Sequence, residues 1–137
     1  MKIKIRSLLT PFNLILAAIL LAAFFIRVYR IDALLGFYYD QGRDALVIWD
    51  FWHEGKPFLV GPTTGLAGIF RGPYYYYLIA PFYFLGRGDP IYPTVFLILT
   101  TVAAVWLIYH LGTKIQDRTT GILAAILASF SYYIVMA

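Results

Sequence analysis

The chain has 137 residues, of which 61% are hydrophobic and only 13% are charged, and its formal net charge is +4. Soluble domains average about 45–50% apolar and about 25% charged residues, so this composition argues against a water-soluble domain and against a disordered chain. The chain has no cysteine, which excludes disulfide bonds and thiolate sites. The composition therefore predicts an all-α integral membrane protein, with room for roughly three or four spans of about 20 residues each.

An apolar run over residues 11–29 is the first predicted transmembrane helix. Arg27 and Arg30 stand where a cleavage site needs small residues, so we expect the run to be retained rather than removed as a signal peptide. The basic residues of segment 1–10 place the amino terminus in the cytoplasm. We expect a multi-pass protein of the plasma (inner) membrane. Other basic residues lie mostly at the ends of apolar runs, which favours contact with the lipid bilayer over nucleic-acid binding.

Residues 30–72 are too polar to span a bilayer, and we expect them to form a long external loop opposite the amino terminus. Between about residues 44 and 53, apolar side chains including two tryptophans recur at helical spacing. This pattern predicts an amphipathic helix that lies in the headgroup region. The Gly-Pro-Thr-Thr-Gly run at residues 61–65 predicts irregular structure, and it lacks the Gly-Lys-Ser/Thr ending of a phosphate-binding loop.

Three further apolar segments follow the loop. Residues 73–86 predict a short transmembrane or re-entrant helix, residues 91–111 predict the clearest span, and residues 121–137 predict a fourth helix. If the 73–86 segment crosses fully, the polar segment 112–120 lies outside. The basic residues of that segment favour the cytoplasmic side instead, so its sidedness stays open.

The start of the external loop holds the first catalytic candidate. Asp40 stands at the boundary between lipid and water, where a carboxylate suits a general base that takes a proton from a hydroxyl. Arg43 and Asp44 are its nearest partners in the sequence. The alternative interpretation is that Asp40 or Asp44 caps the predicted helix.

Arg71 is the second candidate, because a guanidinium directly before Gly72-Pro73 can hold a phosphate through two hydrogen bonds. The alternative is an arginine that extends to lipid headgroups. Asp50, His53 and Glu54 form a third polar group, but they lack the spacing of a metal-binding helix. We therefore assign no metal ligand and no cofactor, and leave a divalent metal open.

Several short motifs follow one another in a fixed order along the chain. They are Arg27-Val28-Tyr29-Arg30, Tyr39-Asp40-Gln41-Gly42-Arg43-Asp44-Ala45-Leu46, Gly55-Lys56-Pro57, Gly61-Pro62, the run from Gly72 to Pro81, the Gly86 to Pro90 turn and Leu111-Gly112. In this order the chain resembles the start of GT-C-type membrane glycosyltransferases, the superfamily of protein O-mannosyltransferases and of the lipid A aminoarabinose transferase. The resemblance runs from about residue 12 to the end of the chain.

The resemblance implies an inverting enzyme that moves a sugar from a polyprenyl-phosphate carrier to a lipid, glycan or protein acceptor on the outer membrane face. Asp40 matches the acid of the first external loop, which implies that it is the base, and Gln41 stands where a second acid is often found. Arg71 occupies the position of a basic residue that contacts the carrier phosphate. The other substrate-binding candidates are Gln41, Arg43, Asp44 and Tyr74.

The resemblance also changes the meaning of the length, because such enzymes have many more spans and the last run is still apolar at Ala137. We expect the chain to be the amino-terminal portion of a longer transferase, and to be inactive by itself. The alternative is a small non-enzymatic membrane protein or subunit that binds a partner through its external loop.

Overall fold

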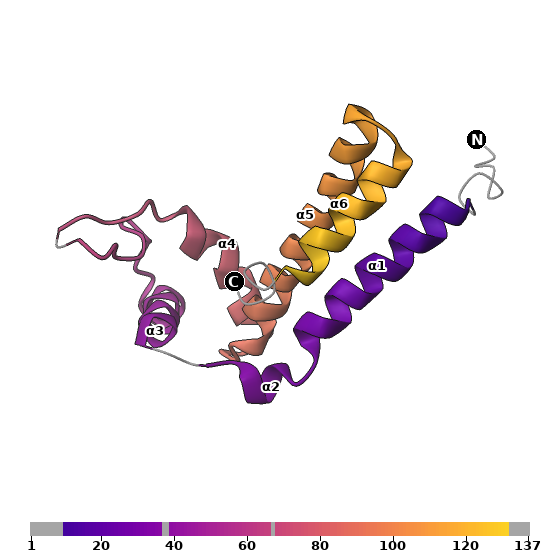
Figure 1. Cartoon of the computed structure of the whole chain (residues 1–137). Coiled ribbons are helices and arrows are strands. Elements are labelled where there is room, and N and C mark those ends of the chain that lie inside the picture. The colour runs from indigo at the N-terminus through magenta and orange to yellow at the C-terminus, as the bar shows by residue number, and fades with distance from the viewer. Residues whose placement is uncertain (1–9, 37–38, 67, 132–137) are drawn as a thin grey trace, which may run out of the picture. The chain divides into compact units, whose positions relative to one another are not determined.

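The structure is a computed structural model that describes residues 10–36, 39–66 and 68–131 (Figure 1). It is 74% helical, and the described residues form no β-sheet. The predicted all-α class is therefore confirmed.

The chain divides into two compact units. The bundle unit comprises residues 1–29 and 97–137, and the loop unit comprises residues 30–96. The predicted cytoplasmic segment and the end of the predicted 121–137 helix fall on residues 1–9 and 132–137, which lie outside the described residues.

Two stretches among the described residues are long and apolar enough to cross a membrane, Pro11–Ala33 and Ile91–Ile115. The first contains helix α1 (Pro11–Val28), which begins after Thr10 because the threonine side chain accepts a hydrogen bond from the Asn13 amide at 3.3 Å. The second is helix α5, which begins where the sequence predicts and extends four residues beyond the predicted end at 111.

Helix α6 (Arg118–Phe130) follows α5 after a tight polar turn. Asp117 caps α6 by accepting a hydrogen bond from the Thr120 amide at 2.7 Å, and this bonding lowers the pKa of the Asp117 carboxyl below its ordinary value. Gly112 and Gly121 let the two helices meet, because a Cβ built on Gly112 would lie 2.9 Å from the Gly121 Cα. The backbones of α5 and α6 are therefore in direct contact beside the turn.

Helices α1 and α6 lie side by side and run in the same direction (Figure 1). At one end the Arg118 guanidinium lies 5.7 Å from the centre of the Phe12 ring. At the other end Arg27 donates a hydrogen bond to the Ser129 carbonyl at 3.3 Å. The residues buried in the core of this bundle are Leu16, Ile19, Val105, Tyr109, Ala125 and Ala128. The α5–α6 turn therefore lies at the end of the bundle unit where α1 begins.

The loop unit contains α2 (Ile31–Leu34), α3 (Tyr39–Glu54) and α4 (Tyr74–Leu85). Helix α3 begins at Tyr39 rather than near residue 44. Its longer amino end has two electrostatic supports. Asp40 lies at the positive end of the helix, and its carboxylate pairs with Arg43 one turn later. The helix ends at Glu54, and the following Gly55 has a φ of 67°, which suits a residue without a side chain.

A short hairpin over residues 61–71 connects the elements that follow α3, in a stretch predicted to be irregular. The Gly61 amide donates to the Arg71 carbonyl and the Arg71 amide donates to the Pro62 carbonyl, both at 2.9 Å. An isolated β-bridge joins Thr63 to Phe70. We call this segment the 61–71 hairpin.

Helix α4 has 12 residues and contains Pro81. At about 1.5 Å rise per residue it is roughly 18 Å long, whereas the hydrocarbon core of a bilayer is about 30 Å thick. Its length matches the short helix predicted at residues 73–86.

Candidate functional site

Arg43 is the centre of a polar cluster at the amino end of α3. Its Nη1 donates to the Asp40 carboxylate at 2.8 Å and to the Thr63 hydroxyl at 2.7 Å. Its Nε and Nη2 donate to Oδ1 of Asp44 at 3.0 and 2.8 Å. One guanidinium therefore joins both acids at the start of α3 to the 61–71 hairpin.

Asp44 is the structural acid of this cluster. Its side chain is only 12% exposed, and the same Oδ1 that faces Arg43 accepts a hydrogen bond from the Tyr76 hydroxyl at 2.9 Å. The hydrogen bond to Asp44 raises the pKa of the Arg43 guanidinium above its ordinary value. Through its hydrogen bond with Tyr76, Asp44 holds α3 against α4.

Asp40 is the accessible acid of the cluster. Its side chain is 77% exposed, and its carboxylate forms an ion pair with the partly buried Arg43. Asp40 also lies in the first turn of α3, where a carboxylate is stabilised by the helix dipole. Of the two acids joined by Arg43, Asp40 is the one that a substrate can reach.

The structure brings together three of the predicted site residues, Asp40, Arg43 and Asp44. Gln41 is exposed beside them in the first turn of α3. Thr63 and Tyr76 complete the cluster, although the sequence did not identify them. Thr63 lies in the Gly-Pro-Thr-Thr-Gly run and Tyr76 lies in a run of four tyrosines. Neither sequence pattern indicates a contact with α3.

Arg71 and Tyr74 have a different environment. The Arg71 backbone pairs with Gly61 and Pro62, whereas its exposed side chain forms no hydrogen bond or ion pair with any other described residue. Tyr74 is 74% exposed at the start of α4. The structure thus leaves the Arg71 guanidinium open to an anion, and does not join it to the Asp40 cluster through side-chain contacts.

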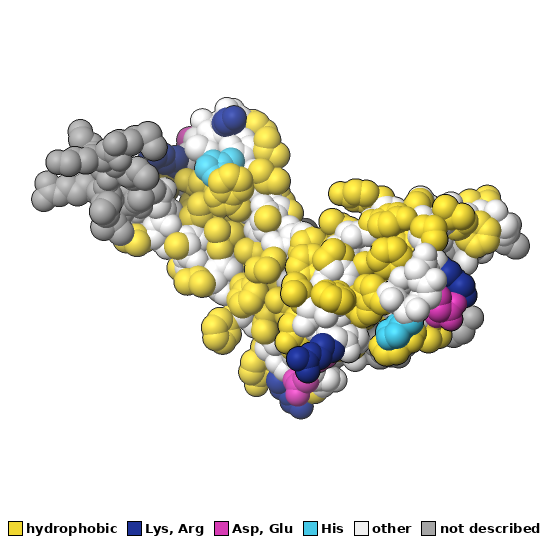
Figure 2. Space-filling model, turned by 180° about the vertical axis from the view of Figure 1, so that it is seen from behind, with side chains coloured by type: hydrophobic (Ala, Val, Ile, Leu, Met, Phe, Trp, Pro, Cys, Tyr) yellow, Lys and Arg dark blue, Asp and Glu magenta, His cyan; other side chains and the backbone are white. Residues whose placement is uncertain are grey.

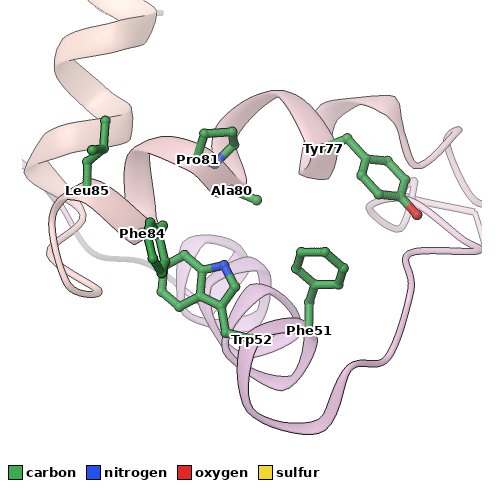
Figure 3. A pocket seen from close by; sticks show the side chains of 7 residues that line it. All are labelled: Phe51, Trp52, Tyr77, Ala80, Pro81, Phe84 and Leu85. Atoms are coloured by element: carbon green, nitrogen blue, oxygen red, sulfur yellow. The ribbon is translucent and has the colours of Figure 1, made fainter.

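An apolar groove of about 430 Å³ lies between α3 and α4 (Figure 3). Phe51 and Trp52 project into it from α3, and the opposite wall belongs to α4. The Trp52 and Phe84 rings meet edge to face at 5.4 Å, and Phe51 packs on Phe58 at 4.7 Å. The lining residues are Phe51, Trp52, Tyr77, Ala80, Pro81, Phe84 and Leu85. Such a lining suits a hydrocarbon chain and offers little to a polar ligand.

The third polar group of the sequence does not assemble into a metal site among the described residues. The His53 ring stacks on Trp49 with centroids 3.8 Å apart, and its Nδ1 lies 3.0 Å from the Trp49 carbonyl. Glu54 pairs with Lys56, which raises the pKa of that lysine. These contacts are those of a helix surface and not of a ligand set.

No protein-family model matches the chain, and neither a curated protein nor a solved structure is significantly similar to it.

Proposed function

We propose that this chain forms the acid-bearing loop and flanking spans of a membrane glycosyltransferase, which moves a sugar from a polyprenyl-phosphate carrier to an acceptor on the outer membrane face. One observation carries the proposal: the Arg43 cluster buries one carboxylate, Asp44, and leaves the other, Asp40, exposed at the end of a helix. A buried pair that orients an exposed carboxylate is the arrangement that a positioned general base requires.

In the proposed reaction, the Asp40 carboxylate takes the proton of the acceptor hydroxyl. The hydroxyl oxygen attacks the anomeric carbon, and the bond between that carbon and the carrier phosphate breaks with its electron pair on the phosphate oxygen. Arg71 offsets the charge on the departing phosphate. Tyr74, three residues after Arg71, and Gln41, next to Asp40, are the further substrate-binding candidates. The groove between α3 and α4 accepts the first apolar units of the carrier.

The proposed membrane arrangement follows from the bundle unit. Only 17% of each candidate span is buried within the protein, so most of these apolar side chains need an apolar surrounding from elsewhere. Hydrophobic side chains are spread over the face shown in Figure 2, and charged ones lie in a few separate groups. We place α1 and α5 across the plasma membrane with the amino terminus in the cytoplasm, α6 beside them in the bundle unit, and α3 as an interfacial helix.

Helix α4 takes the re-entrant or interfacial place in this arrangement. The α5–α6 turn lies at the end of the bundle unit where α1 begins, so it shares the cytoplasmic side with the amino terminus. The chain must then cross the membrane an even number of times from the start of α1 to the end of α5. Crossing by α1 and α5 alone satisfies this count, and a 12-residue α4 is too short to add a full crossing.

The test is Asp40→Asn in the longest open reading frame that contains this chain, reconstituted in liposomes with membrane lipid extract as the donor. Mass spectrometry measures the polyprenyl phosphate released. We expect the variant to lose about 100-fold or more in rate, because a positioned base contributes about that much. The matched control is Asp32→Asn, an exposed acid of α2 outside the cluster, which should transfer normally.

Full transfer by Asp40→Asn would overturn the role of this loop in catalysis, whereas the absence of any transfer by the unsubstituted protein would favour a non-enzymatic protein that binds a partner through the loop. We expect the 137-residue chain expressed alone to release no polyprenyl phosphate.

A further inference from the structure

The segment between Lys56 and Arg71 differs in composition from the rest of the loop unit, because it contains no charged residue. Loops that connect helices normally face water with polar side chains. This one carries exposed apolar side chains along its length, up to 81% exposed at Leu59 and 66% at Leu66. The exposed apolar residues are Leu59, Val60, Leu66, Ile69 and Phe70. So many exposed apolar side chains in one segment mark a surface that is covered in use.

Hydrogen bonds within the protein satisfy several polar groups of the same segment. Backbone hydrogen bonds pair Gly61 and Pro62 with Arg71, and the Thr64 amide donates to the Ile69 carbonyl at 3.1 Å. The Thr63 hydroxyl accepts from Arg43. A hairpin whose arms are paired in this way can enter an apolar medium at lower cost than an open loop.

The two ends of the segment carry basic side chains, of which one is ion-paired. Lys56 pairs with Glu54, whereas the exposed Arg71 side chain has no ion-pair partner among the described residues. Exposed apolar side chains next to an unpaired cation match the layers of an anionic bilayer, with hydrocarbon inside and phosphate outside. The charge of Arg71 therefore favours an anionic lipid surface as the occupant.

We propose that the 57–70 segment inserts its exposed apolar side chains into the adjoining membrane leaflet, and that Arg71 contacts the phosphates of anionic phospholipids. The hairpin then fixes the depth of the loop unit at the bilayer surface. This inference goes beyond the proposed function and does not depend on sugar transfer.

The test uses the absence of native cysteine. Single cysteines at Leu59→Cys, Leu66→Cys and Ile69→Cys are labelled with the environment-sensitive dye NBD in the full chain. The labelled protein is reconstituted in vesicles of phosphatidylcholine and phosphatidylglycerol, with or without phosphatidylcholine brominated on its acyl chains. We expect brominated lipid to quench these probes about as strongly as a probe at Leu107→Cys, an exposed position of α5.

The matched control is Glu54→Cys at the exposed end of α3, which should be quenched by aqueous iodide and much less by brominated lipid. If Leu107→Cys is quenched by brominated lipid but all three hairpin probes are not, the insertion is wrong while the membrane arrangement stands. If Leu107→Cys is not quenched either, both fail. A further outcome is that the hairpin probes are protected from iodide but are not quenched by brominated lipid. If that protection is lost on dilution into excess lipid, a second copy of the chain covers the hairpin and the proposal is overturned.

A second arm tests the charges. We compare labelled Leu66→Cys with the double variant that also carries Arg71→Gln. In vesicles that contain phosphatidylglycerol, the double variant should lose part of the quenching by brominated lipid. In vesicles of phosphatidylcholine alone, the two proteins should be quenched equally. Equal quenching of the two proteins in both kinds of vesicle would overturn the role of anionic phospholipid.

Discussion

At the residue scale, one arginine side chain holds two acids in different surroundings. Arg43 binds Asp44 on its buried side and Asp40 on its exposed side, so the two carboxylates have different surroundings although they lie one turn apart. The sequence named Arg43 and Asp44 as the nearest partners of Asp40, but its predicted helix began near residue 44 and so did not place Asp40 and Arg43 one helical turn apart. It could not predict Tyr76, which comes from 32 positions away along the chain.

Replacing Arg43 by Met should destabilise the loop unit by about 3 kcal/mol, because it leaves the Asp44 carboxylate buried without its cation. The measurement is the free energy of unfolding by denaturant titration in detergent micelles. Arg71→Met is the matched control, since it removes a guanidinium that has no ion-pair partner among the described residues, and it should change this free energy very little. Equal losses in the two variants would contradict the role of the Arg43 cluster.

At the element scale, the helices are largely predictable and their contacts are not. The ends of α1 and α4 and the start of α5 follow from apolar runs bounded by proline, glycine and polar residues, whereas α5 continues four residues beyond its predicted end. The buried face of α3 is less regular than its sequence pattern, since Ile48 is fully buried while Trp49, assigned to the same apolar face, is 49% exposed. The exposure of Trp49 fits a helix that shares its apolar surface between α4 and a membrane interface.

The 61–71 hairpin depends on a glycine whose importance only the structure reveals. A Cβ on Gly61 would lie 2.7 Å from the Arg71 carbonyl oxygen, and closer still to the Gly72 carbonyl. We expect Gly61→Ala to separate the two arms and to speed hydrogen exchange at the Arg71 amide, which donates to the Pro62 carbonyl. Exchange measured by mass spectrometry reports this change.

Gly72→Ala is the control for this substitution, because a Cβ on Gly72 meets no atom within 4 Å. Its Arg71 amide should exchange as slowly as in the unsubstituted chain. If Gly61→Ala also leaves that exchange unchanged, the hairpin does not depend on the close approach of its arms.

At the scale of the whole molecule, composition predicted the class and could not predict the topology. A charged fraction of 13% with a mean hydropathy of +0.75 is enough to indicate a membrane protein. Composition does not indicate which helices run parallel, whereas contacts between distant residues, such as Arg118 with Phe12, show that α1 and α6 do.

A membrane protein of this kind should stay in the membrane pellet after alkaline carbonate extraction, because its spanning helices cannot leave the hydrocarbon without exposing their apolar surface. Immunoblotting of pellet and supernatant measures the distribution, with a peripheral protein as the control for release. Recovery of the chain in the supernatant would contradict the assignment of α1 and α5 as spans.

The contact between Gly112 and Gly121 has a consequence for how the protein enters a membrane. With the two backbones touching beside the turn, no lipid chain can pass between α5 and α6 there. The pair would therefore insert as one helical hairpin, with α6 entering the membrane from the same side on which α5 ends. The orientation of α6 is then inherited from α5, so charges placed near the end of α6 should have little power to reverse it.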